Sequence, residues 1–188
     1  IDLAKYGMSG YAGAAIFAII GVVVTALLQS SHATLTLTLS ALATAQISYE
    51  NAIALAIGSN VGSTITAVLG SINASINGKK LMIAHAIFNV ATALISLIFM
   101  FQFISMLNVV AEYLHIKDDD YLLKLALFHT FFNLLGVAIF YPNIGLMEKF
   151  LNEKINIKVK KEHTATPNFL TPDILGSTEA AKVALINE

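Results

Sequence analysis

Four stretches without a single charged side chain constrain this chain most. No Asp, Glu, Lys or Arg occurs in residues 6–49, 51–78, 81–111 or 125–147. Each stretch matches or exceeds the roughly 20 apolar residues that are needed to cross about 30 Å of hydrocarbon. Charged residues make up 12% of the 188 residues, whereas soluble domains contain about 25%. We therefore expect an all-α polytopic membrane protein.

Charge and cysteine content exclude several function classes. The formal net charge of −1 excludes a strongly basic nucleic-acid surface. The absence of cysteine removes disulfides, zinc-thiolate sites and thiol catalysis. The chain begins at Ile1, without an initiator Met or the pattern of a signal peptide. We read it as part of a longer polypeptide.

The apolar segments follow one another in a simple order. A small-residue-rich helix is expected over 11–28, a second apolar segment over 34–45, and complete spans over 81–103 and 121–141, joined by a polar, acidic connection over 108–120. From Pro142 the chain is charged and amphipathic, and a proline-punctuated linker leads to a helix at 177–187. We expect a membrane domain over 1–150 and, over 151–188, a cytoplasmic linker with the start of a helical soluble domain.

The stretch "TLTLTLS" alternates with period two, which in water favours a strand. An isolated strand leaves its backbone unsatisfied in lipid, and the other segments lack the alternation of a barrel, so a helix is predicted. On that helix Ser30, Thr34 and Thr38 share one face. The hydroxyls of Thr36, Thr38 and Ser40 either bond to their own helix or join neighbouring helices; both readings stay open.

Segment length makes "QSSHA", residues 29–33, the tip of a helical hairpin inside the membrane. The twelve residues of 34–45 form only about 18 Å of helix, which is too short to cross. A second interruption, "GSNVGS", lies within 51–77, where Gly58 and Gly62 are predicted to let the helix unwind. Short or broken apolar segments of this kind mark the binding site of a transporter.

Both interruptions carry neutral groups suited to small ions. Hydroxyls donate and accept, and Gln29 and Asn60 each offer an amide oxygen to a cation and an NH₂ to an anion. Helix starts near Ala33 and Ser63 add positive dipole ends without a titratable charge. Such a site holds an anion reversibly, with co-bound sodium supplying positive charge. The alternative is that both clusters are ordinary interhelical loops at the membrane surface.

The segment "LLQSSHATLTLTLSALATAQISYENAIALAIGSNVGSTITAVLG" resembles the repeat of the type II sodium/phosphate cotransporter family. That repeat reads Gln-Ser-Ser-Ser-Ala-Thr, then an apolar helix, then Gly-Ala-Asn-Ile-Gly-Thr-Thr. "KKLMIAHAIFNVATALI" and "LKLALFHTFFNLLGVAIFYP" resemble the segments that follow, so the resemblance covers about residues 10–150. It implies one half of an inverted-repeat transporter, built from a helical hairpin, a broken helix and two full spans.

The resemblance further implies a bacterial member of the family. The present half is its second repeat, leading toward a PhoU-like domain, and the first repeat lies in the same protein or in a second chain. The implied activity is sodium-coupled phosphate symport by alternating access across the plasma membrane. The partners are then inorganic phosphate, sodium and the lipid bilayer, without nucleic acid and without enzymatic activity.

The resemblance carries over to site residues one by one. His32 replaces the third serine of the family, and Ser59 and Ser63 replace the usual Ala and Thr. The division of sodium and phosphate contacts stays open, and His32 and Thr34 are assigned to the pathway. The implied phosphate contacts are Gln29, Ser30, Ser31, Asn60, Ser63 and Thr64, and the implied sodium contacts are Gln29, Ser30, Ser59, Asn60 and Thr64.

Two alternatives differ in cargo or in class. The first is a sodium-coupled carrier of another small anion. The second is an intramembrane serine protease, with Ser63 or Ser31 as nucleophile and His85 or His129 as base. The protease alternative is weakened because no Gly-x-Ser-Gly sequence surrounds either serine. Because Asn89 and Asn133 each follow a histidine by four residues, the His-Asn pairs are predicted to form interhelical hydrogen bonds, with ion relay as the alternative.

The hairpin also predicts an orientation. If residues 11–45 enter and leave on one side and 51–77 crosses, Lys79 and Lys80 lie opposite Asp118–Asp120. The lysines of the tail, Lys149, Lys154, Lys158, Lys160 and Lys161, then share the side of Lys79. The positive-inside tendency makes that side, and the tail, cytoplasmic.

Overall fold

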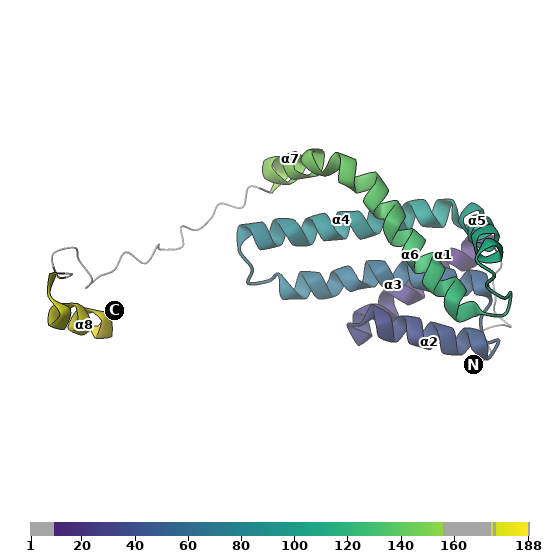
Figure 1. Ribbon diagram of the computed structural model, residues 1–188, viewed down its shortest axis with the longest axis horizontal. Coiled ribbons are helices and arrows are strands. Elements are labelled where there is room, and N and C mark those ends of the chain that lie inside the picture. Colours follow the sequence, from purple (N-terminus) through teal and green to yellow (C-terminus); the bar gives the residue numbers. More distant parts are fainter. Residues whose placement is uncertain (1–9, 156–173, 175, 188) are drawn as a thin grey trace. The chain divides into compact units, whose positions relative to one another are not determined.

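The computed structural model describes residues 10–155, 174 and 176–187, and within these ranges every regular element is helical (Figure 1). The all-α prediction is confirmed. The chain divides into two compact units, residues 1–155 and 156–188. The second unit contains α8 (Thr178–Asn187), where a helix was predicted. The linker and Lys158, Lys160 and Lys161 lie outside the described residues.

The first unit is built around a close pair of helices, α1 (Gly10–Leu28) and α3 (Tyr49–Gly70). Gly58 lies directly against the backbone carbonyl of Ala18, and Gly21 lies against that of Leu55. A Cβ atom at either glycine would overlap the backbone of the other helix. Small residues let two membrane helices approach this closely. Because lipid is as apolar as the helix surfaces, the helices are held together by van der Waals packing rather than by the hydrophobic effect.

The helix α3 is continuous, so the predicted break at "GSNVGS" is wrong. Gly58 and Gly62 stand one helical turn apart and face α1, which gives them a packing role rather than a hinge role. The hydroxyl and amide groups of the motif bond back to carbonyls of the same helix. They are therefore satisfied without unwinding.

The polar segment after α1 is a tight turn into α2 (Ser31–Ala43), as the hairpin prediction requires. The alternating "TLTLTLS" stretch is helical. With 13 residues, α2 is about 20 Å long, too short to cross. Its partner α1 is one of four helical segments, among the residues that the structure describes, that are long and apolar enough to span a membrane.

Residues 76–113 form two helices where one span and a polar connection were predicted. The helix α4 (Ile76–Ile98) begins before Leu81 and ends before Phe103, and α5 (Met100–Tyr113) follows it. The polar connection thus shrinks to residues 114–120. Figure 1 shows α3 and α4 side by side, with α5 turned away from the end of α4.

The chain changes direction in the last part of the first unit. The helix α6 (Tyr121–Phe140) passes through the short 3₁₀ turn η2 (Tyr141–Asn143) into α7 (Ile144–Lys154). Pro142 lies in the turn, where its missing N–H is tolerated. At this end Lys80 Nζ donates to Asn152 Oδ1 at 2.7 Å, joining the start of α4 to α7.

The opposite end of the first unit gathers tyrosines and acidic residues. The rings of Tyr49 and Tyr121 lie 6.0 Å apart, and Lys124 pairs with Asp118 at 3.0 Å. These contacts bring the starts of α3 and α6 together. The start of α4 and α7 therefore share one end of the unit, and Asp118 lies at the other.

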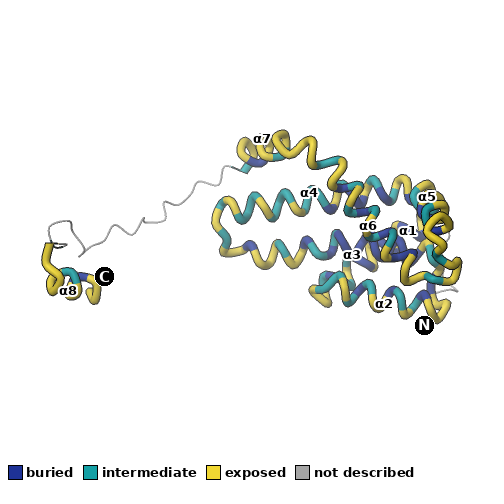
Figure 2. Tube along the Cα trace, viewed as in Figure 1, coloured by how far each residue is buried: buried dark blue, intermediate teal, exposed yellow. Residues whose placement is uncertain are grey.

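Burial differs sharply among the helices (Figure 2). Every residue from Asn51 to Asn60 in α3 is buried, so this helix is the core element. Other helices expose large apolar side chains, including Leu27 at 79% and Leu81 at 72%. Faces of this kind suit contact with lipid or with further apolar protein surface.

Candidate functional site

The hairpin tip is tied together by two buried threonines. Thr25 Oγ1 of α1 donates to Thr34 Oγ1 of α2 at 2.8 Å, and Thr34 Oγ1 donates to the Ser30 carbonyl at 3.2 Å. Thr25 is fully buried and Thr34 nearly so. The chain of hydrogen bonds thus runs from the last turn of α1 through the start of α2 to the turn.

The same threonine joins the tip to the second motif. A Cβ on Gly62 of α3 would lie 2.7 Å from Cβ of Thr25, so the two residues are in direct contact. Since Ala18 meets Gly58 and Thr25 meets Gly62, α1 and α3 run in parallel and reach the site together. The structure therefore brings the regions of "QSSHA" and "GSNVGS" to the same place without a break in α3.

The turn presents the start of α2 at its tip. Gln29 adopts a φ of 51°, in the left-handed region that glycine occupies without cost. Ser30 caps the helix, its hydroxyl accepting the Ala33 N–H at 3.2 Å. Within the described part of the chain, the N–H groups of Ser31 and His32 carry no protein acceptor, as expected at a helix start.

Exposure differs among the predicted tip residues. Gln29 and His32 are exposed, while Ser30 and Ser31 are half-buried. Residues 29–33 therefore offer two N–H donors, hydroxyls and one amide, and their one titratable side chain, His32, is exposed. A helix start of this kind favours binding of an anion even though the site has no fixed positive charge.

The motif on α3 is more buried than the tip. Ser59, Asn60 and Thr64 are buried and Ser63 is half-buried. Asn60 Nδ2 donates to the Ala56 carbonyl at 3.0 Å, and Ser63 Oγ donates to the Asn60 carbonyl at 2.6 Å. One Asn60 N–H and the Ser63 hydroxyl proton are used inside the helix. The Asn60 Oδ1 and the lone pairs of Ser63 Oγ remain as acceptors, which are cation ligands.

The two His-Asn pairs correct one prediction. The Asn89 amide donates to the His85 carbonyl at 3.0 Å, and the Asn133 amide donates to the His129 carbonyl at 2.7 Å. These bonds lie within α4 and α6, so the predicted interhelical bonds of the asparagines are wrong. Thr36 Oγ1, Thr38 Oγ1 and Thr44 Oγ1 likewise donate within α2 or to its last turn.

Neither of the candidate serine nucleophiles is hydrogen-bonded to a histidine in the described residues. Ser63 donates to a backbone carbonyl, and among the described residues no serine hydroxyl donates to a histidine. A nucleophile needs its base within hydrogen-bond reach. This geometry gives the protease alternative no support.

Two features of this region were not predicted from the sequence. Thr25 is a single hydroxyl in an apolar helix, but it continues the small-residue face of Gly21 by one turn. The Gly58-x-x-x-Gly62 spacing is the signal of close helix packing and identifies the α3 face that meets α1. Together these two patterns mark the place where α1 and α3 come into contact.

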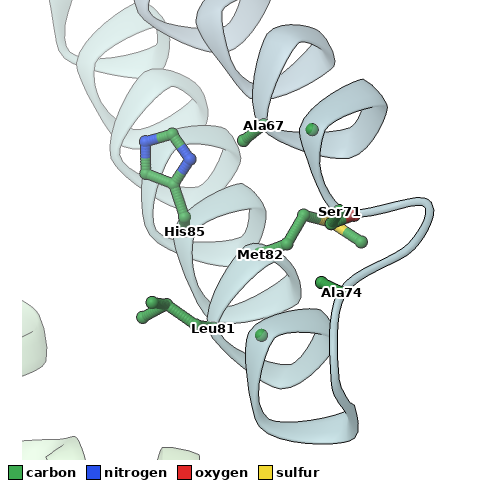
Figure 3. A pocket seen from close by; sticks show the side chains of 8 residues that line it. Ala67, Ser71, Ala74, Leu81, Met82 and His85 are labelled. Carbon is green, nitrogen blue, oxygen red and sulfur yellow. The ribbon is translucent and has the colours of Figure 1, made fainter. Parts of the chain in front are cut away.

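A hollow lies between the end of α3 and the start of α4 (Figure 3). Its volume is about 470 Å³, and small residues such as Ala67 and Ala74 form much of its wall. Figure 3 shows Met82 extending toward Ser71, while Leu81 and His85 lie on another side of α4. None of the predicted sodium or phosphate contacts lines it.

The fold is that of a multi-pass membrane protein, and hydroxyl and amide groups of two motifs lie where α1, α2 and α3 meet. The chain belongs to the Na+/Pi-cotransporter family, whose family model matches residues 10–116. The match includes both motifs and the first His-x-x-Phe-Asn sequence, and the family is one of transporters rather than enzymes.

A curated relative is similar over most of this chain. Uncharacterized protein YqeW of Bacillus subtilis (strain 168) is 27% identical over 140 residues, which cover 74% of this chain and 43% of that protein. The chain thus spans less than half the length of this relative. No solved structure matches the chain.

Proposed function

We propose that this chain forms one half of a sodium-driven phosphate symporter, with its site at the junction of the hairpin tip and the α3 motif. The observation that carries the proposal is the contact of Thr25 with both Thr34 and Gly62. It joins two motifs that are separate in sequence and both rich in neutral ligand groups. Family membership supports sodium and phosphate as the cargo.

The two sides of the junction suit different ions. The free N–H groups at Ser31 and His32 favour phosphate, with the hydroxyls of Ser30 and Ser31 and the Gln29 amide beside them. Asn60 Oδ1 and the oxygens of Ser59, Ser63 and Thr64 favour sodium, and bound sodium in turn attracts phosphate. We assign coupling to this mutual attraction, because neither side carries a fixed charge of its own.

The complete transporter requires the first repeat, in the same protein or in a second chain, and works by alternating access. Residues 1–150 constitute the second repeat, and residues 151–188 lead toward a helical cytoplasmic domain. The contact of Lys80 with Asn152 supports a common cytoplasmic side for the lysines of α4 and α7. Asp118–Asp120 then face outward across the plasma membrane.

Uptake of labelled phosphate into sealed vesicles that contain the complete protein tests the proposal. Replacing sodium by choline should abolish uptake, since sodium supplies the positive charge of the site. Uptake that continues unchanged in choline would contradict sodium coupling. Sodium-dependent uptake of another small anion, with phosphate failing to compete, would reassign the cargo.

An asparagine pair tests the assigned site. Asn60→Ala should lower sodium-dependent uptake at least tenfold, corresponding to about 1.4 kcal/mol, because a buried cation ligand is lost. Asn143→Ala is the matched control, since Asn143 Nδ2 makes the same bond within its helix turn at 2.8 Å but is exposed. Equal uptake by the two variants at equal expression would remove Asn60 from the site.

A further inference from the structure

An apolar groove runs between α4 and the corner of α6 and α7. It has a volume of about 390 Å³. Its walls include Leu81 and Phe88 of α4, Val137 and Phe140 of α6, and Ile144 and Met147 of α7. Leu81 and Ile144 are 72% and 68% exposed. The groove is therefore open along helices that are long and apolar enough to cross the membrane.

One end of the groove becomes polar. A second hollow of about 350 Å³ shares Leu81, Ala84, Ile144 and Met147 with the groove and adds Asn77, Lys80, Glu148 and Asn152. Lys80 Nζ reaches across it to Asn152 Oδ1. A continuous surface thus passes from hydrocarbon walls to an ammonium group near the start of α4.

Positive charge dominates this end. At this end α4 and α7 carry four lysines, Lys79, Lys80, Lys149 and Lys154, and α7 carries two acidic residues, Glu148 and Glu153. Lys149 is paired with Glu153 at 3.9 Å. Within residues 10–155 neither Lys79 nor Lys80 forms a salt bridge, which leaves both charges available to an anion.

We propose that the groove binds an anionic phospholipid, with an acyl chain between α4 and α6 and the headgroup phosphate at Lys80. The apolar part lies along the spanning helices, and the ammonium group lies at their end, where headgroups begin. An apolar protein segment in the same place would cover Lys80 without supplying a counter-charge. A phospholipid matches both ends of the surface.

Tryptophan fluorescence tests this proposal, because the chain contains no tryptophan. Tyr141, 77% exposed, lines the groove, and Tyr141→Trp in the complete protein, cleared of any other tryptophan, places a single reporter at its rim. Quenching is compared in bilayers that contain phosphatidylglycerol or phosphatidylcholine with brominated acyl chains. Brominated phosphatidylglycerol should associate at this reporter about fivefold more strongly, the factor for one basic residue near a headgroup.

Two matched variants separate the groove from general lipid contact. Tyr113→Trp makes the same replacement at a residue 82% exposed on α5 and should show no preference for phosphatidylglycerol. In the Tyr141→Trp background, Lys80→Gln should reduce the preference to about one, and Lys117→Gln, at the acidic end, should leave it unchanged.

Three results would overturn the proposal. The first is equal association of the two lipids at the Tyr141→Trp reporter. The second is a lack of quenching by either lipid, which would show that protein covers the groove. The third is a preference that survives Lys80→Gln.

Discussion

The hairpin tip and the α3 motif use similar residues in opposite ways. At the tip the helix ends, Gln29 takes a left-handed conformation, and the start of a new helix is presented. In α3 the helix continues through Gly58 and Gly62, and its polar side chains bond to their own helix. Glycine next to hydroxyl and amide groups is thus not itself a sign of a break in a helix. Whether it marks a break or a packing contact depends on the neighbouring helix.

The largest expected effect tests the packing role of glycine in α3. Gly58→Ala places a methyl group against the Ala18 carbonyl and should lower the free energy of unfolding by at least about 3 kcal/mol, the upper range for overpacking. Circular dichroism during denaturation in detergent measures it. Gly70→Ala is the control, because nothing lies within 4 Å of a Cβ there.

A hinge glycine would behave differently. If α3 unwound at Gly58, alanine would favour the helix by about 1 kcal/mol and leave the fold intact. If Gly58→Ala and Gly70→Ala were equally stable, the result would support a break in α3 at Gly58. It would contradict the contrast between the two motifs.

The next effect separates conformation from chemistry at the tip. Gln29→Gly relieves the positive φ and should raise the free energy of unfolding by about 1 kcal/mol, yet lower phosphate uptake at least tenfold because the amide is lost. Denaturation and vesicle uptake, measured on the same preparations, give the two numbers. Uptake at the level of the unmodified protein would show that only the backbone of Gln29 matters.

A smaller effect probes the threonine link between α1 and α2. Thr34→Val removes the acceptor of the Thr25 hydroxyl and should cost about 1 kcal/mol of unfolding free energy. The double variant with Thr25→Val should cost little more, because both partners of one bond are then absent. Thr36→Val, at an exposed residue that bonds to the His32 carbonyl, is the control.

Additive costs in that double variant would contradict the link. They would show that the two hydroxyls act independently and that the tip is held to α1 by apolar packing alone.

The sequence was informative where length and charge decide the outcome. Charge-free stretches predicted the helical spans, the twelve apolar residues after "QSSHA" predicted a short hairpin arm, and bilayer physics correctly overrode the strand-like alternation. The site residues of both motifs were named from residue chemistry and resemblance, and their roles remain proposals.

The sequence was uninformative where the role of a residue depends on the helix that packs against it. Gly58 and Gly62 fit a hinge as well as a packing face until α1 is placed against them. Thr25 gains its role only through Thr34 and Gly62. The division of α4 from α5 at Phe99 has no glycine or proline to mark it, and nothing in the structure explains it.

Substrate protection of engineered cysteines tests the central claim, that both motifs form one site, most directly. The chain contains no cysteine, and Ser31→Cys and Ser63→Cys place small thiols at half-buried positions of the tip and of α3. In the complete protein, cleared of other cysteines, sodium and phosphate together should slow thiol labelling at both positions with the same dependence on phosphate concentration. Protection at one position alone, or different concentration dependences at the two, would contradict a shared site.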